Sequence, residues 1–281
     1  MRTTIRLLTL IALALPLASG TASAKKKAPS LPPSEQTAKA ALESSPRHGE
    51  FVDVRALDGG TPIRTWVVYP ERKDKAGVVI LIHEIYGLSD WLRGVADAFA
   101  AAGFIAVAPD LISGLGPGGG GTDSCATRDD VVKLVRSVTP QMAEARLDAV
   151  RAYAVTLPST NGRVATVGFC WGGGRSFEFA ASDAPPDGAV VYYGVSPDSA
   201  AIPRVGAPVL GLYGGDDARV DATVGPAKAA LDKLGRRYDV NTFEGAGHGF
   251  LRAQEDRNGA NLRATEKAWP LTLKFMHSHL D

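Results

Sequence analysis

One short stretch of the sequence, residues 168–172, has the composition of a turn that presents a reactive thiol. It reads Gly-Phe-Cys-Trp-Gly and follows the strand-forming run 163–167. This is the spacing of a nucleophile elbow, the sharp turn between a strand and a helix, with cysteine in place of serine. The glycines leave room for a strained backbone, and a helix N-terminus below the sulfur favours a thiolate. The stretch therefore predicts Cys170 as a nucleophile, with a buried structural cysteine as the alternative.

An acid and a histidine follow the candidate nucleophile, each just after a later strand-like run. Gly-Gly-Asp-Asp occupies residues 214–217, and Gly-Ala-Gly-His-Gly-Phe occupies residues 245–250. The order nucleophile, acid, histidine accompanies the elbow motif. His248 would accept the thiol proton and later protonate the leaving oxygen, while an aspartate would fix its tautomer. We predict Asp217 as this acid because one further residue past the strand reaches the site better, with Asp216 as the alternative.

Apolar runs and helix-like stretches alternate from residue 51 onward, and this alternation must position the three side chains. The expected strands are about 51–57, 63–69, 78–82, 104–108, 163–167, 189–193, 209–213 and 238–243. The expected helices are about 90–102, 127–137, 140–157, 171–182, 221–234 and 262–280. A hairpin followed by alternating strands and helices predicts one α/β domain with a mostly parallel sheet flanked by helices, in the order of an α/β hydrolase. Ligands bind such sheets beyond the carboxyl ends of the strands, where Glu84 and Cys170 lie.

Four motifs, in this order along the chain, resemble the dienelactone hydrolase (carboxymethylenebutenolidase) family. They are His-Glu-Ile-Tyr-Gly at 83–87, Gly-Phe-Cys-Trp-Gly-Gly at 168–173, Gly-Asp-Asp at 215–217 and Gly-His-Gly-Phe at 247–250. Each motif alone is weak, but the set of four is specific and spans the chain from residue 51.

The resemblance implies a role for each residue of the expected site. Cys170, His248 and Asp217 would form a catalytic triad. Glu84 would help to deprotonate the thiol once substrate binds, although a carboxylate at a strand end also suits an ordinary ion pair. Two backbone N–H donors suffice for an oxyanion hole, and one such donor is typically worth about 3 kcal/mol in the transition state. The backbone N–H groups of Ile85 and Trp171 would supply them.

The family's substrate is an anionic lactone that arginines hold. Arg252 lies four residues after His248 and matches one of these arginines, with a solvated arginine as the alternative. The second arginine has no clean match, because the glycine-rich stretch 114–121 departs from the family pattern. Arg128 lies nearby in the sequence and is left unassigned. This departure, together with an export signal, leaves the particular ester or lactone open.

Composition limits the partners of the protein. The 281 residues are 45% hydrophobic and carry a formal net charge of +1, which argues against nucleic acid or a polybasic membrane contact. His83 and His248 lack partners at metal-ligand spacing, so we expect no metal, and we expect no cofactor. A small-molecule lactone or ester is the expected partner, and we expect a monomer without a stable membrane anchor.

The two cysteines raise the question of a disulfide, which an exported chain with one pair would ordinarily form. A bond between Cys125 and Cys170 would consume the nucleophile and distort the elbow. We therefore predict that Cys170 is free and that Cys125 has no catalytic role.

The N-terminus has the pattern of a signal peptide, predicted at residues 1–24. Arg2 and Arg6 precede an apolar run too short to span a membrane, and Ala-Ser-Ala at 22–24 forms a cleavage site. An uncleaved anchor is the alternative. Residues 25–48 are rich in Lys, Pro, Ser and Ala and predict a flexible leader before the domain at 49–281. We expect export to a bacterial periplasm.

Together, these features predict a cysteine-dependent hydrolase that cleaves a small lactone or ester through a thioester intermediate. A general carboxylesterase is the first alternative. A larger apolar acyl pocket, and an activity that depends only weakly on Arg252, would favour it. A non-catalytic binding protein on a hydrolase fold is the second, since fold alone does not decide function.

Overall fold

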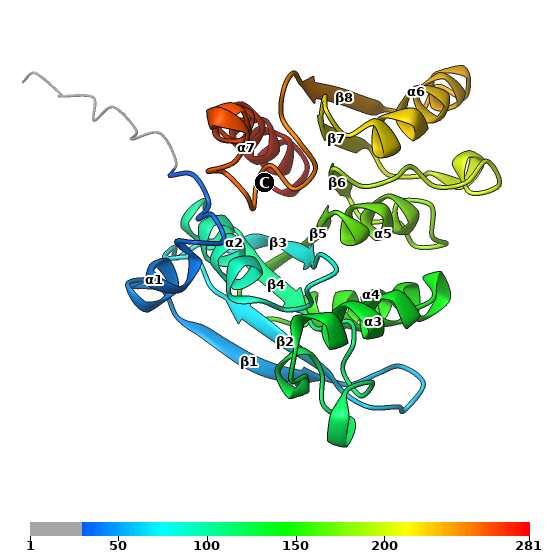
Figure 1. Cartoon of the computed structure of the whole chain (residues 1–281). Coiled ribbons are helices and arrows are strands. Elements are labelled where there is room, and N and C mark those ends of the chain that lie inside the picture. Colours follow the sequence, from blue (N-terminus) through cyan, green and yellow to red (C-terminus); the bar gives the residue numbers. More distant parts are fainter. Residues whose placement is uncertain (1–29) are drawn as a thin grey trace, which may run out of the picture.

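The computed structural model describes residues 30–281, so the expected signal peptide lies outside the described part. One eight-stranded sheet has the order β1-β2-β4-β3-β5-β6-β7-β8 (Figure 1). The strands are β1 (Gly49–Val54), β2 (Ile63–Val68), β3 (Ala76–Ile82), β4 (Ile105–Pro109), β5 (Thr160–Phe169), β6 (Gly188–Tyr192), β7 (Val209–Gly214) and β8 (Tyr238–Phe243). Strand β2 pairs antiparallel with β1 and β4, and every other pairing is parallel. The predicted single α/β-hydrolase domain with a mostly parallel sheet is confirmed.

Helices cover both faces of the sheet (Figure 1). One face packs against α2 (Asp90–Ala101) and α7 (Ala260–Leu280). The other face packs against α4 (Pro140–Ala154), α5 (Trp171–Phe179) and α6 (Ala218–Lys233). Helix α3 (Arg128–Ser137) packs beside the start of α4, and four 3₁₀ turns complete the connections: η1 (Pro117–Gly119), η2 (Thr122–Ser124), η3 (Ile202–Arg204) and η4 (Arg257–Gly259).

The central strands are buried along their whole length. Strands β3, β4, β6 and β7 have no residue outside the core. Helices on both faces remove these strands from water, which explains why they read as continuous apolar runs rather than as alternating ones. Because all of them are parallel, their carboxyl ends meet at one edge of the sheet, where the expected site residues follow.

Residues 30–48 differ from the prediction of a flexible leader. They contain α1 (Ala38–Glu43), which packs beside α2 (Figure 1). Ala38 is fully buried, and Gln254 donates from Nε2 to the Pro32 carbonyl over 3.0 Å. The prediction was wrong for these residues because it rested on their polar composition. The few residues that pack against the domain are spread among many polar ones, so composition does not reveal them. We call residues 30–48 the N-terminal strap; residues 25–29 of the predicted leader are outside the described part.

Candidate active site

Cys170 occupies a sharp turn between β5 and α5. Its backbone has φ 55° and ψ −115°, and its N–H donates to the Tyr192 carbonyl of the neighbouring strand over 3.0 Å. A Cβ on Gly168 would lie 1.8 Å from the Gly172 carbonyl oxygen, and a Cβ on Gly172 would lie 2.3 Å from the Ile82 carbonyl oxygen. Only glycine fits at either position, so the two glycines of the motif are required by backbone contact.

His248 connects Cys170 to Asp217. Its Nε2 lies 3.0 Å from Sγ of Cys170, and its Nδ1 lies 2.5 Å from Oδ2 of Asp217. Asp217 follows β7 and precedes α6, while His248 lies in the loop after β8. Three elements far apart in the sequence thus place thiol, imidazole and carboxylate in one hydrogen-bonded line, the geometry by which a base activates a nucleophile.

Asp216, the alternative acid, faces away from this line. Its Oδ2 pairs with Nη1 of Arg257 over 2.7 Å, and about half of its side chain is exposed. Only 8% of the Asp217 side chain is exposed. The structure therefore brings Asp217 rather than Asp216 to His248, as the longer reach past the strand predicts.

Glu84 lies beside the thiol in a buried ion pair. Its Oε2 accepts from Nε of Arg252 over 2.9 Å, and its Oε1 accepts from the Tyr193 hydroxyl over 3.1 Å. The Tyr193 ring also meets the His248 ring edge-on, with centroids 5.2 Å apart. Tyr193 is a site residue that the sequence reading missed, because it ends an apolar run that reads only as strand. It adopts φ 39°, a conformation rare for a bulky residue, directly after β6.

A family model of the dienelactone hydrolase family matches residues 63–280. The chain belongs to the dienelactone hydrolase family. A carboxymethylenebutenolidase of Pseudomonas putida is 30% identical over 221 residues, covering 76% of this chain and 91% of the relative.

Solved structures share the fold. A dienelactone hydrolase from Anabaena variabilis has a TM-score of 0.61 at 22% identity, covering 84% of this chain and 99% of its own. A dienelactone hydrolase-like promiscuous phosphotriesterase from metagenomic libraries has a TM-score of 0.67 at 22% identity, with the same coverage. At this identity the likeness extends to the fold alone.

In this dienelactone hydrolase family member, the surroundings of the sulfur favour a protonated thiol. Burial, and then the nearby charge of Glu84, raise the pKa of Cys170 to about 12, while a hydrogen bond from the Trp171 backbone opposes the rise. Burial also raises the pKa of Glu84, against the opposing charge of Arg252. The expected effect of the helix N-terminus, which would favour a thiolate, is thus smaller than the opposing effect of burial.

Ile85 and Trp171, the expected oxyanion donors, follow the carboxyl ends of the neighbouring strands β3 and β5. Ile85 directly follows Glu84 after β3, and Trp171 is the first residue of α5, whose N–H has no intrahelical acceptor. The Trp171 ring stacks on His83, with centroids 5.3 Å apart. His83 is itself buried, with Nδ1 2.7 Å from the Glu84 carbonyl and Nε2 accepting from the Leu111 N–H over 3.1 Å. Burial lowers the pKa of His83, so it is a neutral structural residue.

The glycine-rich stretch 114–121 is anchored beside the turn that carries Glu84. Asp110 accepts from the backbone and the hydroxyl of Thr122 over 2.6 and 2.9 Å. The same hydroxyl accepts from the Leu88 N–H over 3.0 Å. These bonds fix the end of the glycine-rich stretch, and with it the start of α3, next to the site.

Both cysteines are free, as predicted for Cys170. Cys125 lies at the end of η2, with its thiol 3.7 Å from the Gly121 carbonyl. Within residues 30–281, no group of three or more His, Cys, Asp or Glu side chains is arranged to hold a metal ion. None of the helices in the same range combines the length and apolarity that a membrane crossing requires.

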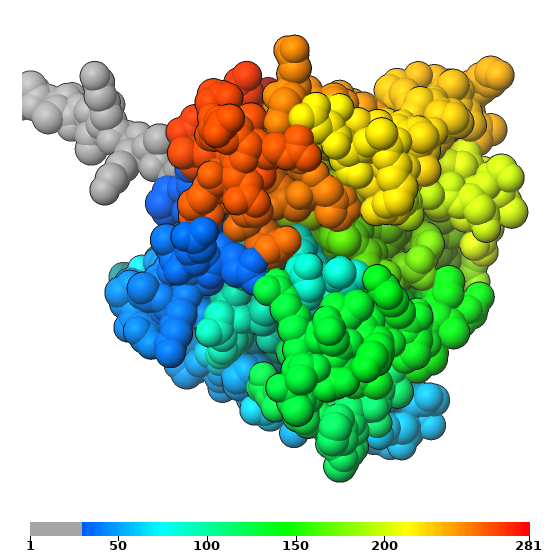
Figure 2. Space-filling view, in the orientation of Figure 1, coloured from blue at the N-terminus to red at the C-terminus, as the bar shows by residue number. Residues whose placement is uncertain are grey.

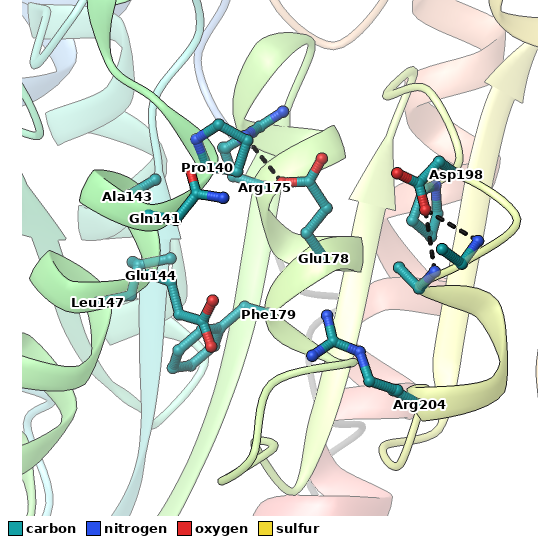
Figure 3. Close-up of a pocket in the computed structure, with 13 residues that line it drawn as sticks. Pro140, Gln141, Ala143, Glu144, Leu147, Arg175, Glu178, Phe179, Asp198 and Arg204 are labelled. Carbon is teal, nitrogen blue, oxygen red and sulfur yellow. Dashed lines mark hydrogen bonds and ion pairs between the residues drawn. The ribbon is translucent and has the colours of Figure 1, made fainter.

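A separate pocket of about 310 Å³ lies between α4, α5 and η3 (Figure 3). Arg175 and Glu178 of α5 form an ion pair of 2.8 Å on its wall, and Arg204 lines the other side (Figure 3). The lining includes neither Cys170 nor His248, so this pocket is distinct from the site at the elbow.

Proposed function

We propose that the protein hydrolyses a small ester or lactone through a thioester formed on Cys170. The observation that carries the proposal is the line of hydrogen bonds from Asp217 through His248 to the thiol. Family membership supplies the reaction class, and the site supplies a nucleophile, a base and an orienting acid. No step requires a cofactor.

In the first half of the proposed reaction, Sγ of Cys170 attacks the carbonyl carbon while His248 accepts the thiol proton. The tetrahedral oxyanion is held by the N–H groups of Ile85 and Trp171. The carbon–oxygen bond to the leaving group then breaks, and the imidazolium returns the proton to the leaving oxygen. The acyl group remains on Cys170 as a thioester.

In the second half, water replaces the thiol. His248 accepts a proton from the water as its oxygen attacks the thioester carbonyl. The carbon–sulfur bond breaks, and the sulfur of Cys170 recovers the proton. The acid product leaves, and the resting thiol is regenerated.

Glu84 and Arg252 have proposed roles that follow from the charge around the thiol. The carboxylate of Glu84 keeps the resting sulfur protonated, and its displacement during substrate binding would let it assist deprotonation, as the family resemblance implies. Arg252 holds Glu84, and the family resemblance makes it the expected contact of a substrate carboxylate. In the structure Arg252 is already paired with both Glu84 and Glu35, which restricts that contact.

The test is direct trapping of the acyl-enzyme. Protein covering residues 25–281 is incubated with lactones and with p-nitrophenyl esters of graded chain length, and intact mass is measured after rapid quenching. We expect an acyl adduct that hydroxylamine removes, and its absence from the Cys170→Ala variant. A folded Cys170→Ala variant with unchanged turnover would overturn the proposal. If turnover depends steeply on acyl length and no lactone is hydrolysed, the general carboxylesterase is favoured. If no substrate is turned over, the non-catalytic binding protein is favoured.

We also propose that the protein is exported to a periplasm as a monomer, with cleavage after residue 24. The proposal rests on the charged, apolar and Ala-Ser-Ala segments of residues 1–24. Expression of the full chain in a Gram-negative host, followed by N-terminal sequencing of the periplasmic fraction, tests it. Retention of residue 1 in the membrane fraction would contradict it, and sedimentation measures the oligomeric state.

A further inference from the structure

Glu35 of the N-terminal strap joins two arginines at the edge of the active site. Its Oε1 accepts from Nη2 of Arg128 over 2.7 Å, and its Oε2 accepts from Nη1 of Arg252. Both guanidinium groups lie over the ring of Tyr86, at 3.5 Å and 5.1 Å from its centroid. A carboxylate held by two guanidinium groups beside an aromatic ring is the arrangement in which proteins bind carboxylate ligands.

The position of Glu35 is fixed by the strap rather than by its side chain alone. The backbone N–H of Glu35 donates to the Arg252 carbonyl over 2.9 Å, and Ser34 donates from its hydroxyl to Glu255. Ala38 anchors the next turn in the core. Figure 2 shows the blue strap lying directly against the orange segment that contains these partners. These backbone and core contacts therefore hold the Glu35 carboxylate next to Arg128 and Arg252.

Arg252 links Glu35 to the reacting centre. Its Nη1 contacts Glu35 while its Nε contacts Glu84, and only 19% of its side chain is exposed. Its charge acts on the thiol, because it lowers the pKa of Cys170 against the larger effect of burial. Glu35 is thus connected through Arg252 to Glu84, the carboxylate whose charge acts on the sulfur.

The charges of this cluster balance. Arg128 and Arg252 contribute two positive charges, while Glu35 and Glu84 contribute two negative ones. Within this cluster a substrate carboxylate would meet no uncompensated positive charge and would have to displace Glu35; Arg219, whose charge also lowers the pKa of Cys170, is not part of the cluster. An uncharged acyl group does not have to displace Glu35. The Glu35 carboxylate is thus a repulsive element that selects against anionic substrates.

We infer that Glu35 is a specificity-determining residue whose carboxylate occupies the two-arginine site, so that uncharged substrates are preferred to those with a carboxylate. The inference rests on the proposed function for its kinetic consequence, but the occupied anion site can be tested without turnover. Replacing Glu35 by glutamine keeps the size and the backbone contacts and leaves one positive charge uncompensated.

The kinetic experiment compares Glu35→Gln with wild type on p-nitrophenyl valerate, which is neutral, and mono-p-nitrophenyl succinate, which is anionic. We expect the ratio of kcat/KM for the anionic to the neutral ester to rise about three- to five-fold, because the side chains of Arg128 and Glu35 are 51% and 38% exposed and solvent weakens their pairing. Glu255→Gln is the matched control, because it removes a carboxylate that holds the same strap without touching either arginine. Its ratio should stay at the wild-type value.

The binding experiment uses glutarate and calorimetry on Cys170→Ala and on Cys170→Ala combined with Glu35→Gln. We expect about three- to five-fold tighter binding when Glu35 is replaced. Tighter glutarate binding without turnover of any ester or lactone would support the inference and overturn the proposed function. Turnover with an unchanged ester ratio and unchanged glutarate binding would overturn the inference alone.

Discussion

Glu84 and Arg252 form an ion pair that is withdrawn from water next to the reactive thiol. Nε of Arg252 donates to Oε2 of Glu84 over 2.9 Å, and the two side chains are 19% and 4% exposed. The negative partner raises the pKa of Cys170, and the positive partner lowers it. Burial is the largest cause of the raised pKa of Cys170, and the pair modulates that pKa without being part of the triad.

Glu84→Gln should make the thiol more acidic. Loss of the carboxylate removes a charge that raises the pKa of Cys170 and frees Arg252 to lower it further, so the thiolate fraction at pH 8 should rise about ten-fold for each pKa unit. Iodoacetamide alkylation, measured in a Cys125→Ser background, reports this fraction. Slower or unchanged alkylation would contradict the electrostatic role of Glu84, and Glu255→Gln should leave the rate unchanged.

The wild-type thiol should react slowly at neutral pH and faster with each step toward alkaline pH. Because the pKa of Cys170 is raised to about 12, the thiolate fraction should increase about ten-fold per pH unit between pH 7 and pH 10. The measurement is the second-order alkylation rate of Cys170 across this range, again without Cys125. A plateau near pH 8 would mean that the resting sulfur is already a thiolate.

Asp217→Asn should lower kcat by several orders of magnitude, whereas Asp216→Asn should lower it little. The first change removes the carboxylate that holds Nδ1 of His248, and the second removes only an exposed pair with Arg257. Steady-state kinetics on one ester measure both. Equal losses would show that the two neighbouring aspartates act together.

Gly168→Ala should destabilise the domain strongly, because the new Cβ would overlap the carbonyl of Gly172. Gly225→Ala is the matched control: it lies inside α6, and apart from its own helix no atom lies within 4 Å of the new Cβ. It should change stability by less than about 1 kcal/mol, because the helix preference of alanine is opposed by contact of its Cβ with the ring of Pro226. Thermal unfolding compares the two. A Gly168→Ala variant with wild-type stability and activity would show that the elbow does not depend on this close contact.

Ala38→Asp should detach the N-terminal strap. Ala38 is fully buried, and an aspartate there would lose about 2 kcal/mol or more in hydration, unless the strap leaves its site. Limited proteolysis should then cut within residues 30–48 while the rest of the domain stays intact. Lys39→Asp, at an exposed neighbour, should leave the cleavage pattern unchanged. Cleavage elsewhere first would indicate that the strap supports the whole fold.

The alternation of apolar runs and the spacing of three motifs were enough to predict the sheet and to select Cys170, Asp217 and His248. Such features are local, because each motif directly follows its own strand. Tyr193 could not be predicted, since its unusual backbone conformation appears only where β6 ends against the His248 loop. Glu35 could not be predicted either, since it meets Arg252 across 217 residues of chain.

That long separation has a consequence for biosynthesis. Ribosomes complete the strap long before they make Arg252, Gln254 and Glu255, the residues on which it docks. Helix α1 can pack beside α2 as soon as α2 is made, but Glu35 has no arginine partner at position 252 until translation is almost complete. Contacts between distant parts of the chain also carry the largest loop-closure cost, which places docking late in folding. The contacts between Glu35 and Arg252 are thus among the last to form, and the charge balance at the two arginines is established only at that step.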